Sequence, residues 1–154
     1  AILQALSQLK EAVGDRVILT AGKMHASGVL SEAGEKILTE NEVESFVDAG
    51  ADVILLPAPG TVPGISMEYA TKLIKRAHEK GALAMTTIGT SQEGADEATI
   101  RQIALMCKMA GADIHHIGES GYMGMALPEN IMAYSVAIRG KRHTYRRMAV
   151  SLLR

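Results

Sequence analysis

The sequence has very little cysteine. Cys107 is the only cysteine among 154 residues, so an internal disulfide is impossible and a reducing compartment is the simplest setting. No cluster of cysteine and histidine has the spacing of a structural zinc site. Cys107 shares the apolar stripe of a predicted helix, 96–110, with Ile100, Ile103 and Ala104. This position favours a buried structural thiol over a nucleophile.

Long hydrophobic runs are absent as well. No apolar stretch reaches the roughly 18–20 residues that span a bilayer, and no basic segment followed by an apolar one marks a signal peptide. With 47% hydrophobic residues and a net charge of −1, the composition is that of a soluble globular domain with one substantial core. We therefore expect a cytoplasmic protein without a membrane partner.

The strongest positive signal is an internal repeat of about 30 residues. Gly50, Gly81 and Gly111 are each followed by alanine and a short apolar run, at intervals of 31 and 30 residues. Each glycine follows an amphipathic segment and suits the position after a helix, where a positive φ is needed. The apolar runs read as parallel strands covered on both faces. The four predicted strands are 17–20, 53–56, 83–85 and 114–117.

Helix start and stop signals lie between these strands. Thr39 and Glu42 form a capping-box pattern, and Ser66 is a candidate N-cap. Pro128 suits the first turn of a helix that Gly140 ends. A last helix is expected to bury four residues on one face, namely Tyr145, Met148, Ala149 and Leu152.

Strands that alternate with helices predict an α/β fold with a parallel sheet, either part of a (βα)8 barrel or an open doubly wound sheet. The open sheet usually carries G-x-G-x-x-G after its first strand, and that motif is missing here, which favours the barrel. A whole barrel typically needs ~200–250 residues. Because residues 2–13 already have a helical pattern, we expect a single domain, 1–154, whose N-terminal part is missing. It would be the C-terminal half of a barrel, or a half-barrel that must pair.

In a barrel the chemistry lies just after the strands, and the first such loop contains Lys23 and His25. A lysine there can act as a base, a Schiff-base amine or a phosphate partner, and histidine is an acid or base near neutral pH. The alternative is a solvated lysine and a structural histidine. We predict both as catalytic residues.

The second and third loops offer candidate ligand-binding residues. The proline- and glycine-rich turn 57–64 includes Gly60 and Thr61 and leads to a helix N-terminus near Ser66, which favours an anion. It lacks the Lys-Ser/Thr pair of a Walker A motif, and a stiff connector is the alternative. In the third loop, Thr90 and Ser91 are predicted to bind a phosphate or sugar. Glu93 is a possible magnesium ligand, with a plain helix cap as the alternative.

The fourth strand is the most distinctive, because two histidines lie near its end. Neighbouring strand residues face opposite sides, so we expect His115 to face the barrel interior with Asp113 and His116 to pack beneath a helix. Residues 118–124 follow and, with the turn 57–64, predict an anion site. Within that segment Glu119 is a candidate catalytic residue. The candidate ligand-binding residues there are Gly118, Ser120 and Gly121.

The C-terminal segment 139–154 carries six positive charges, so the remainder sums to −7 (−1 − 6). It has Tyr145 but no interleaved stacking aromatics, which argues against nucleic-acid binding. A solvated or subunit-facing helix is the favoured interpretation, and we expect a homo-oligomer.

Three segments, residues 13–25, 56–60 and 128–133, together resemble an uncharacterised bacterial TIM-barrel family found near sugar-phosphotransferase genes. Its members carry loose labels, either hydrolase or phosphoenolpyruvate-mutase-like. The resemblance covers nearly the whole chain and implies a barrel and a phosphorylated metabolite. It supplies no established catalytic residues that could be assigned to this chain. More broadly, the Gly-Ala-Asp repeat resembles phosphate-binding (βα)8 barrels.

These observations favour an enzyme that acts on a small phosphorylated or carboxylated metabolite by lyase or isomerase chemistry. Lys23 or a histidine would remove a proton next to a carbonyl, and other polar groups or a metal such as Mg²⁺ would stabilise the enolate. One alternative is a metal-assisted hydrolase that uses Glu93 or Glu119 with a histidine. Another is a non-catalytic barrel that binds a sugar phosphate and regulates a partner.

Overall fold

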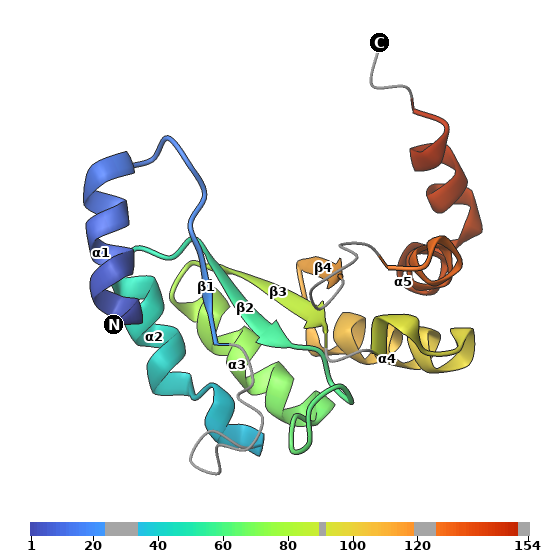
Figure 1. Ribbon diagram of the computed structural model, residues 1–154, viewed down its shortest axis with the longest axis horizontal. Coiled ribbons are helices and arrows are strands. Elements are labelled where there is room, and N and C mark those ends of the chain that lie inside the picture. Colours follow the sequence, from blue (N-terminus) through green and yellow to red (C-terminus); the bar gives the residue numbers. More distant parts are fainter. Residues whose placement is uncertain (24–33, 90–91, 119–125, 151–154) are drawn as a thin grey trace.

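Four parallel strands form one sheet in the computed structural model, which describes residues 1–23, 34–89, 92–118 and 126–150 (Figure 1). The strands lie in sequence order, so each pairs with the next. They are β1 (Thr20–Gly22), β2 (Val53–Pro57), β3 (Leu83–Ile88) and β4 (Ile114–Ile117). The α/β class and the four parallel βα units predicted from the sequence are confirmed.

The helices lie between the strands, as the repeat predicts. They are α1 (Ile2–Val13), α2 (Glu40–Asp48), α3 (Met67–Glu79), α4 (Glu97–Ala110) and α5 (Pro128–Met148), with 3-10 turns η2 (Gly34–Ile37) and η3 (Gln92–Gly94). Local sequence sets their ends. The capping box of Thr39 and Glu42 begins α2, and the hydroxyl of Ser66 accepts a hydrogen bond from Tyr69 N at the start of α3. Gly111, which follows α4, has a φ of 97°.

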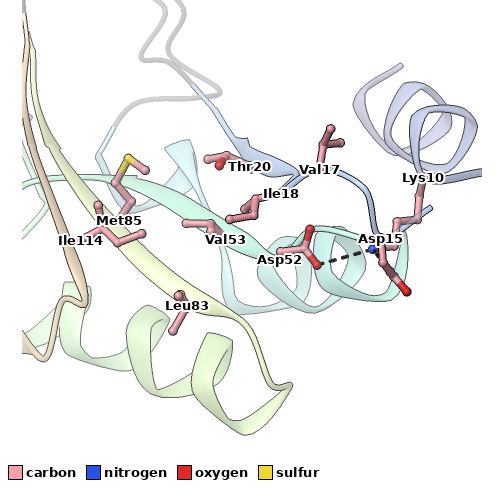
Figure 2. A pocket seen from close by; sticks show the side chains of 10 residues that line it. All are labelled: Lys10, Asp15, Val17, Ile18, Thr20, Asp52, Val53, Leu83, Met85 and Ile114. Carbon is pink, nitrogen blue, oxygen red and sulfur yellow. Dashed lines mark hydrogen bonds and ion pairs between the residues drawn. The ribbon is translucent and has the colours of Figure 1, made fainter. Parts of the chain in front are cut away.

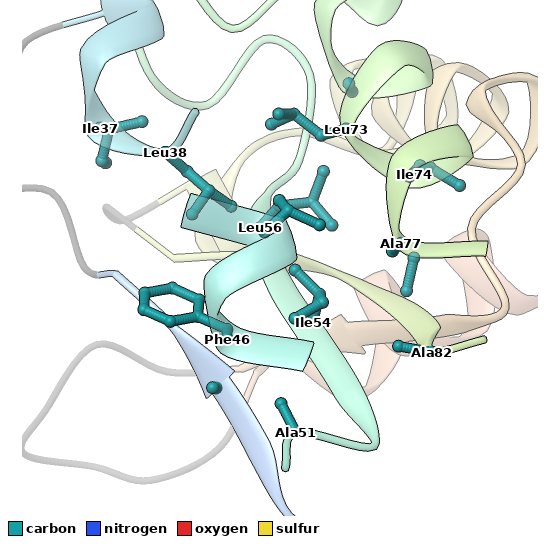
Figure 3. Packing of buried hydrophobic residues seen from close by; sticks show 14 of the residues in the cluster. Ile37, Leu38, Phe46, Ala51, Ile54, Leu56, Leu73, Ile74, Ala77 and Ala82 are labelled. Carbon is teal, nitrogen blue, oxygen red and sulfur yellow. The ribbon is translucent and has the colours of Figure 1, made fainter. Parts of the chain in front are cut away.

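The main core lies between the sheet and the helices α2 and α3 (Figure 3). From the sheet, Ile54 and Leu56 point into it, and both are fully buried. Phe46 of α2 and Leu73 and Ile74 of α3 meet them from the helix layer. Full burial of a side chain such as leucine stabilises a fold by roughly 1.5–3 kcal/mol, so this layer holds β2 in place.

Alternate strand residues point to the other side of the sheet, which we call the open face. Near the start of the strands it forms a pocket of about 450 Å³ lined by Val53, Leu83, Met85 and Ile114, with Ile18 beside them (Figure 2). Leu83 is 48% exposed and Ile18 is 77% exposed. Within the described residues the sheet therefore has two free edges and an apolar face, as expected for part of a barrel rather than a closed one.

The first strand lies further along the chain than predicted. The apolar run 17–20 was the expected strand, but β1 begins at Thr20. Pairing with β2 starts where Leu19 O accepts hydrogen bonds from Asp52 N and Val53 N. Residues before Leu19 reach the sheet without a ladder, and Ile18 remains exposed because of this.

The end of α5 also differs from the prediction. Gly140, with φ 78° and ψ 162°, interrupts the helix as expected. The segment after it then points away from the sheet (Figure 1). Tyr145 is 54% exposed and Met148 66% exposed, so the expected burial of that face, Ala149 included, is wrong. Leu152 lies outside the described residues.

The aspartates of the Gly-Ala-Asp repeat tie each strand to its neighbour. Asp52 accepts a hydrogen bond from Leu19 N at 2.8 Å, and Asp113 accepts one from Ala84 N at 2.8 Å. Asp113 also lies 2.7 Å from the Nε2 atom of His78 on α3. In both repeats the carboxylate thus binds the backbone of the preceding strand near its start.

We expect Asp113→Ala to lower the free energy of unfolding by about 2 kcal/mol at neutral pH, because the N–H of the fully buried Ala84 loses its acceptor. Burial alone would raise the pKa of Asp113, but the hydrogen bonds from His78 and Ala84 outweigh it and lower that pKa. The folded-state pKa then lies below the unfolded one. The stabilisation is therefore complete above about pH 4 and is lost as the pH falls through the folded-state pKa.

Urea denaturation of wild type and Asp113→Ala at pH 7 and pH 3 measures this difference. Asp48→Ala is the matched control, since its carboxylate is 62% exposed and pairs with Lys80. Loss of an exposed ion pair should lower stability by less than about 1 kcal/mol. Equal losses of stability in Asp113→Ala and Asp48→Ala would contradict the role given to Asp113. So would a stability difference between wild type and Asp113→Ala that is as large at pH 3 as at pH 7.

Candidate functional site

The side chains of the open face form layers across the sheet. The strand register places Leu55, Met85 and Ile114 side by side in one apolar layer. Two residues further along the strands, the register aligns Pro57 with Thr87 and Thr87 with His116. The layer nearest the carboxyl ends of the strands is therefore the one that carries polar groups.

Thr87 and His116 are accessible at this position. Thr87 is partly exposed and His116 is exposed. Neither side chain makes a hydrogen bond or an ion pair with another of the described residues. A hydroxyl and an imidazole on neighbouring strands, at the carboxyl end of a parallel sheet, form a small polar centre that can bind and exchange protons with a ligand.

The two histidines of β4 face opposite sides, as strand alternation requires, but the predicted assignment is reversed. His115 lies on the helix side, where its Nδ1 atom is 3.0 Å from the hydroxyl of Tyr134 on α5. Burial, with the charges of Arg139 and Lys108, lowers the pKa of His115. Asp113 shares the side of His115, as predicted, but that side is the helix side. The sequence could not settle this, because β4 has an isoleucine and a histidine on each face.

Gly118 has a different role from the one predicted. It was expected to let a ligand approach the backbone, yet the imidazole of His116 occupies that space. A Cβ atom built on Gly118 would lie 2.2 Å from His116 Cε1. The ring of His116 therefore lies along the strand, above the Cα atom of Gly118. Whether a ligand also contacts Gly118 stays a prediction.

Lys23 follows β1 on the helix side rather than on the open face. Its Nζ atom lies 3.1 Å from Oε1 of Glu42, the glutamate of the capping box that begins α2. Burial would raise the pKa of Glu42, but the backbone N–H of Thr39 and the ammonium of Lys23 lower it overall. The lysine thus helps to fix the start of α2, and its predicted catalytic role remains untested.

The turn 57–64 uses most of its own donors. Gly60 N donates to Ile65 O, Thr61 N donates to Ala58 O, and the Thr61 hydroxyl donates to Ala58 O at 2.7 Å. Gly60 has a φ of 83°, which only glycine adopts readily. These bonds stiffen the turn and leave it fewer groups for an anion, and ligand binding by Gly60 and Thr61 stays a prediction.

Glu93 was predicted as a metal ligand. Its Oε2 atom is buried without a hydrogen-bond partner, and its backbone oxygen accepts a hydrogen bond from Asn130 at 2.7 Å. Among the described residues, no three acidic, histidine or cysteine side chains come together as a metal site would require. Binding of Mg²⁺ by Glu93 therefore gains no support from neighbouring ligands among the described residues, and it stays a prediction.

Six predicted site residues lie outside the described residues. They are His25, Thr90, Ser91, Glu119, Ser120 and Gly121. Sequence reasoning also missed Thr87, which sits inside an apolar strand. The sequence signal for it was the polar pair Thr86-Thr87 near the carboxyl end of that strand.

Comparison with known proteins places the chain in a family. Residues 1–154 match the model of a family described as a domain of unknown function, DUF7916, so the chain belongs to that family. A Haemophilus influenzae protein provisionally named N-acetylmannosamine-6-phosphate 2-epimerase is 34% identical over 88 residues. That match covers 57% of this chain and 33% of the relative, so it spans about a third of that protein.

Solved structures with a similar fold include barrel-type aldolases. The deoxyribose phosphate aldolase of Aeropyrum pernix gives a TM-score of 0.62 at 19% identity, over 89% of this chain and 56% of that one. An aldolase named QR15 gives a TM-score of 0.64 at 13% identity, over 90% of this chain and 61% of that one. At these identities the likeness shows the fold alone. It agrees with part of a (βα)8 barrel, and these matches do not support the phosphoenolpyruvate-mutase-like part of the resemblance. Separately, none of the described helices is long and apolar enough to cross a membrane.

Proposed function

We propose that this member of the DUF7916 family forms part of a sugar-phosphate enzyme of isomerase or lyase type, with its chemistry at the carboxyl ends of β3 and β4. The observation that carries the proposal is the polar layer of the open face. In that layer Thr87 of β3 and His116 of β4 are neighbours in the strand register. The layer before it, two residues nearer the start of the strands, is apolar. Similarity to a relative named for a sugar-phosphate epimerase supports the substrate class.

In this proposal His116 is the acid and base. An imidazole can remove a proton from a carbon next to a carbonyl, or protonate a departing oxygen, at neutral pH. Thr87 donates its hydroxyl hydrogen to the carbonyl or hydroxyl oxygen of the same substrate, where negative charge develops. Neither group has another partner among the described residues, so both are available for a ligand.

The phosphate would bind where helices begin. The first N–H groups of α3 and α5 carry the positive end of each helix dipole and suit an anion. The predicted ligand-binding residues Ser120 and Gly121 precede α5, and Gly60 and Thr61 precede α3. The proposed homo-oligomer would supply the strands that close the barrel if no other residues do.

Titration with sugar phosphates, followed by NMR, tests the proposal. We expect N-acetylmannosamine 6-phosphate or a related sugar phosphate at millimolar concentration to shift the backbone N–H signals of Thr87 and His116. Inorganic phosphate alone should shift the loops but not these two signals, and Asp48, on the far helix layer, is the internal control. Unchanged signals at Thr87 and His116 with every sugar phosphate would overturn the proposed site. Binding without turnover would instead favour a regulatory barrel.

A further inference from the structure

Helix α5 changes direction at Gly140, and a hydrogen bond joins the two parts beyond the bend. Gly140 has φ 78° and ψ 162°, and we call the segment that follows it, residues 141–150, the arm (Figure 1). Thr144 of the arm is 3% exposed, and its hydroxyl lies 3.0 Å from the hydroxyl of Ser135 on the first part of α5. This buried contact makes the bend a defined feature of the fold rather than a frayed helix end.

The bend encloses an apolar groove of about 530 Å³ between the first part of α5 and the arm. Pro128, Ile131 and Met132 line it from the first part, and Thr144 and Met148 line it from the arm. Ile131 is 42% exposed and Met148 is 66% exposed. Glu129 is the acidic residue among those that line the groove. Exposed apolar side chains that gather on one surface, rather than being scattered, are typical of an interaction site.

A different side of the arm is basic. Arg142, Arg146 and Arg147 lie together on it and line none of the groove. None of these three arginines makes an ion pair with another of the described residues. No acidic residue follows Glu129 in the sequence, whereas the residues before 139 sum to −7 (−1 − 6). The arm is therefore complementary in charge to the rest of the chain that carries it.

We propose that α5 binds a second copy of this chain, with the arm of each copy placed in the groove of the other. Two arms do not simply pair with each other, because their positive charges repel. A two-fold axis avoids this repulsion, since it brings the arginines of each arm to the acidic body of the other copy, with Glu129 beside the groove. The same exchange covers the exposed Ile131 and Met148. This interface leaves the open face free and does not rest on the proposed function.

Analytical ultracentrifugation of the chain over a range of concentrations tests the apolar part of this interface. We expect the wild-type chain to dimerise and Met148→Gln to raise the Kd of the dimer at least about tenfold, because a two-fold dimer buries the new amide twice. Met109→Gln is the matched control, since Met109 lies on α4, is 69% exposed and does not line the groove. A wild-type chain that stays monomeric, or an equal Kd for the two variants, would overturn the proposal.

Charge reversal tests which surfaces meet. Glu129→Arg in one chain, and Arg146→Glu with Arg147→Glu in another, should each raise the Kd of the dimer, because like charges then face each other. An equal mixture of these two variants should dimerise about as well as wild type, since both contacts of the mixed dimer join opposite charges. A mixture that associates no better than its components would overturn the proposal. So would a wild-type monomer that binds vesicles of anionic phospholipid through the same arginines, which would assign the arm to a membrane surface.

Discussion

His116→Gln is expected to lower kcat on a sugar phosphate by about 10²–10⁴-fold, the usual contribution of a positioned acid or base. Glutamine keeps much of the size and hydrogen-bonding capacity of the ring, but it cannot carry a proton between substrate and water. Stability should change little, because His116 is exposed rather than part of the core. Substrate binding should also change little, because the glutamine amide can still form a hydrogen bond. The loss should therefore appear in kcat rather than in KM.

The neighbouring histidine provides the matched control for this substitution. His115→Gln disturbs the contact between the imidazole and the buried Tyr134 hydroxyl and is expected to lower the free energy of unfolding by about 0.5–1.5 kcal/mol. It should retain most of the turnover at a temperature where the variant is folded. A larger loss of kcat in His115→Gln than in His116→Gln would show that the open face is not the reacting face.

Gly22→Ala is expected to be among the most destabilising small substitutions in this chain. A Cβ on Gly22 would lie 2.3 Å from the backbone oxygen of Leu55, its partner across β1 and β2. The backbone of a central strand cannot move aside as a flexible side chain does, so the two strands must separate. Overpacking of this kind costs about 1–3 kcal/mol or more, and here it acts on a strand of only three residues.

Thermal and urea denaturation measure the effect, with Gly89→Ala as the control. Gly89 also follows a strand on the same sheet, but a Cβ there meets nothing within 4 Å. We expect Gly89→Ala to leave the unfolding midpoint nearly unchanged and Gly22→Ala to lower it clearly. Two variants of equal stability would mean that β1 and β2 are not as close at Gly22 as the structure has them.

Local signals were enough to place most elements. Caps at Thr39 and Ser66, and glycines after helices such as Gly111, mark helix ends through bonds within a few residues, so the sequence predicts them well. The strand β1 shows where this fails. The apolar run 17–20 looks like a strand, but strands are defined by pairing, and the ladder with β2 begins only at Leu19 and Thr20.

The site was harder to predict because it depends on which face each residue takes. Strand alternation correctly separated His115 from His116, but it could not say which one lies beneath α5. His115 lies beside Tyr134, a contact between residues 19 apart in sequence that only the fold shows. Likewise, Lys23 reads as a loop lysine after a strand, and only the fold shows that Glu42 of α2 lies beside it.

The central claim is that the open face near Thr87 and His116 exchanges a proton with a sugar phosphate. Proton NMR in D₂O tests it most directly, because removal and return of a proton next to a carbonyl replaces that hydrogen with deuterium. The account predicts that the wild-type chain catalyses this exchange in N-acetylmannosamine 6-phosphate or a related sugar phosphate, and that His116→Gln does so at a rate at least about 10²-fold lower. Exchange at the same rate in wild type and His116→Gln would contradict it.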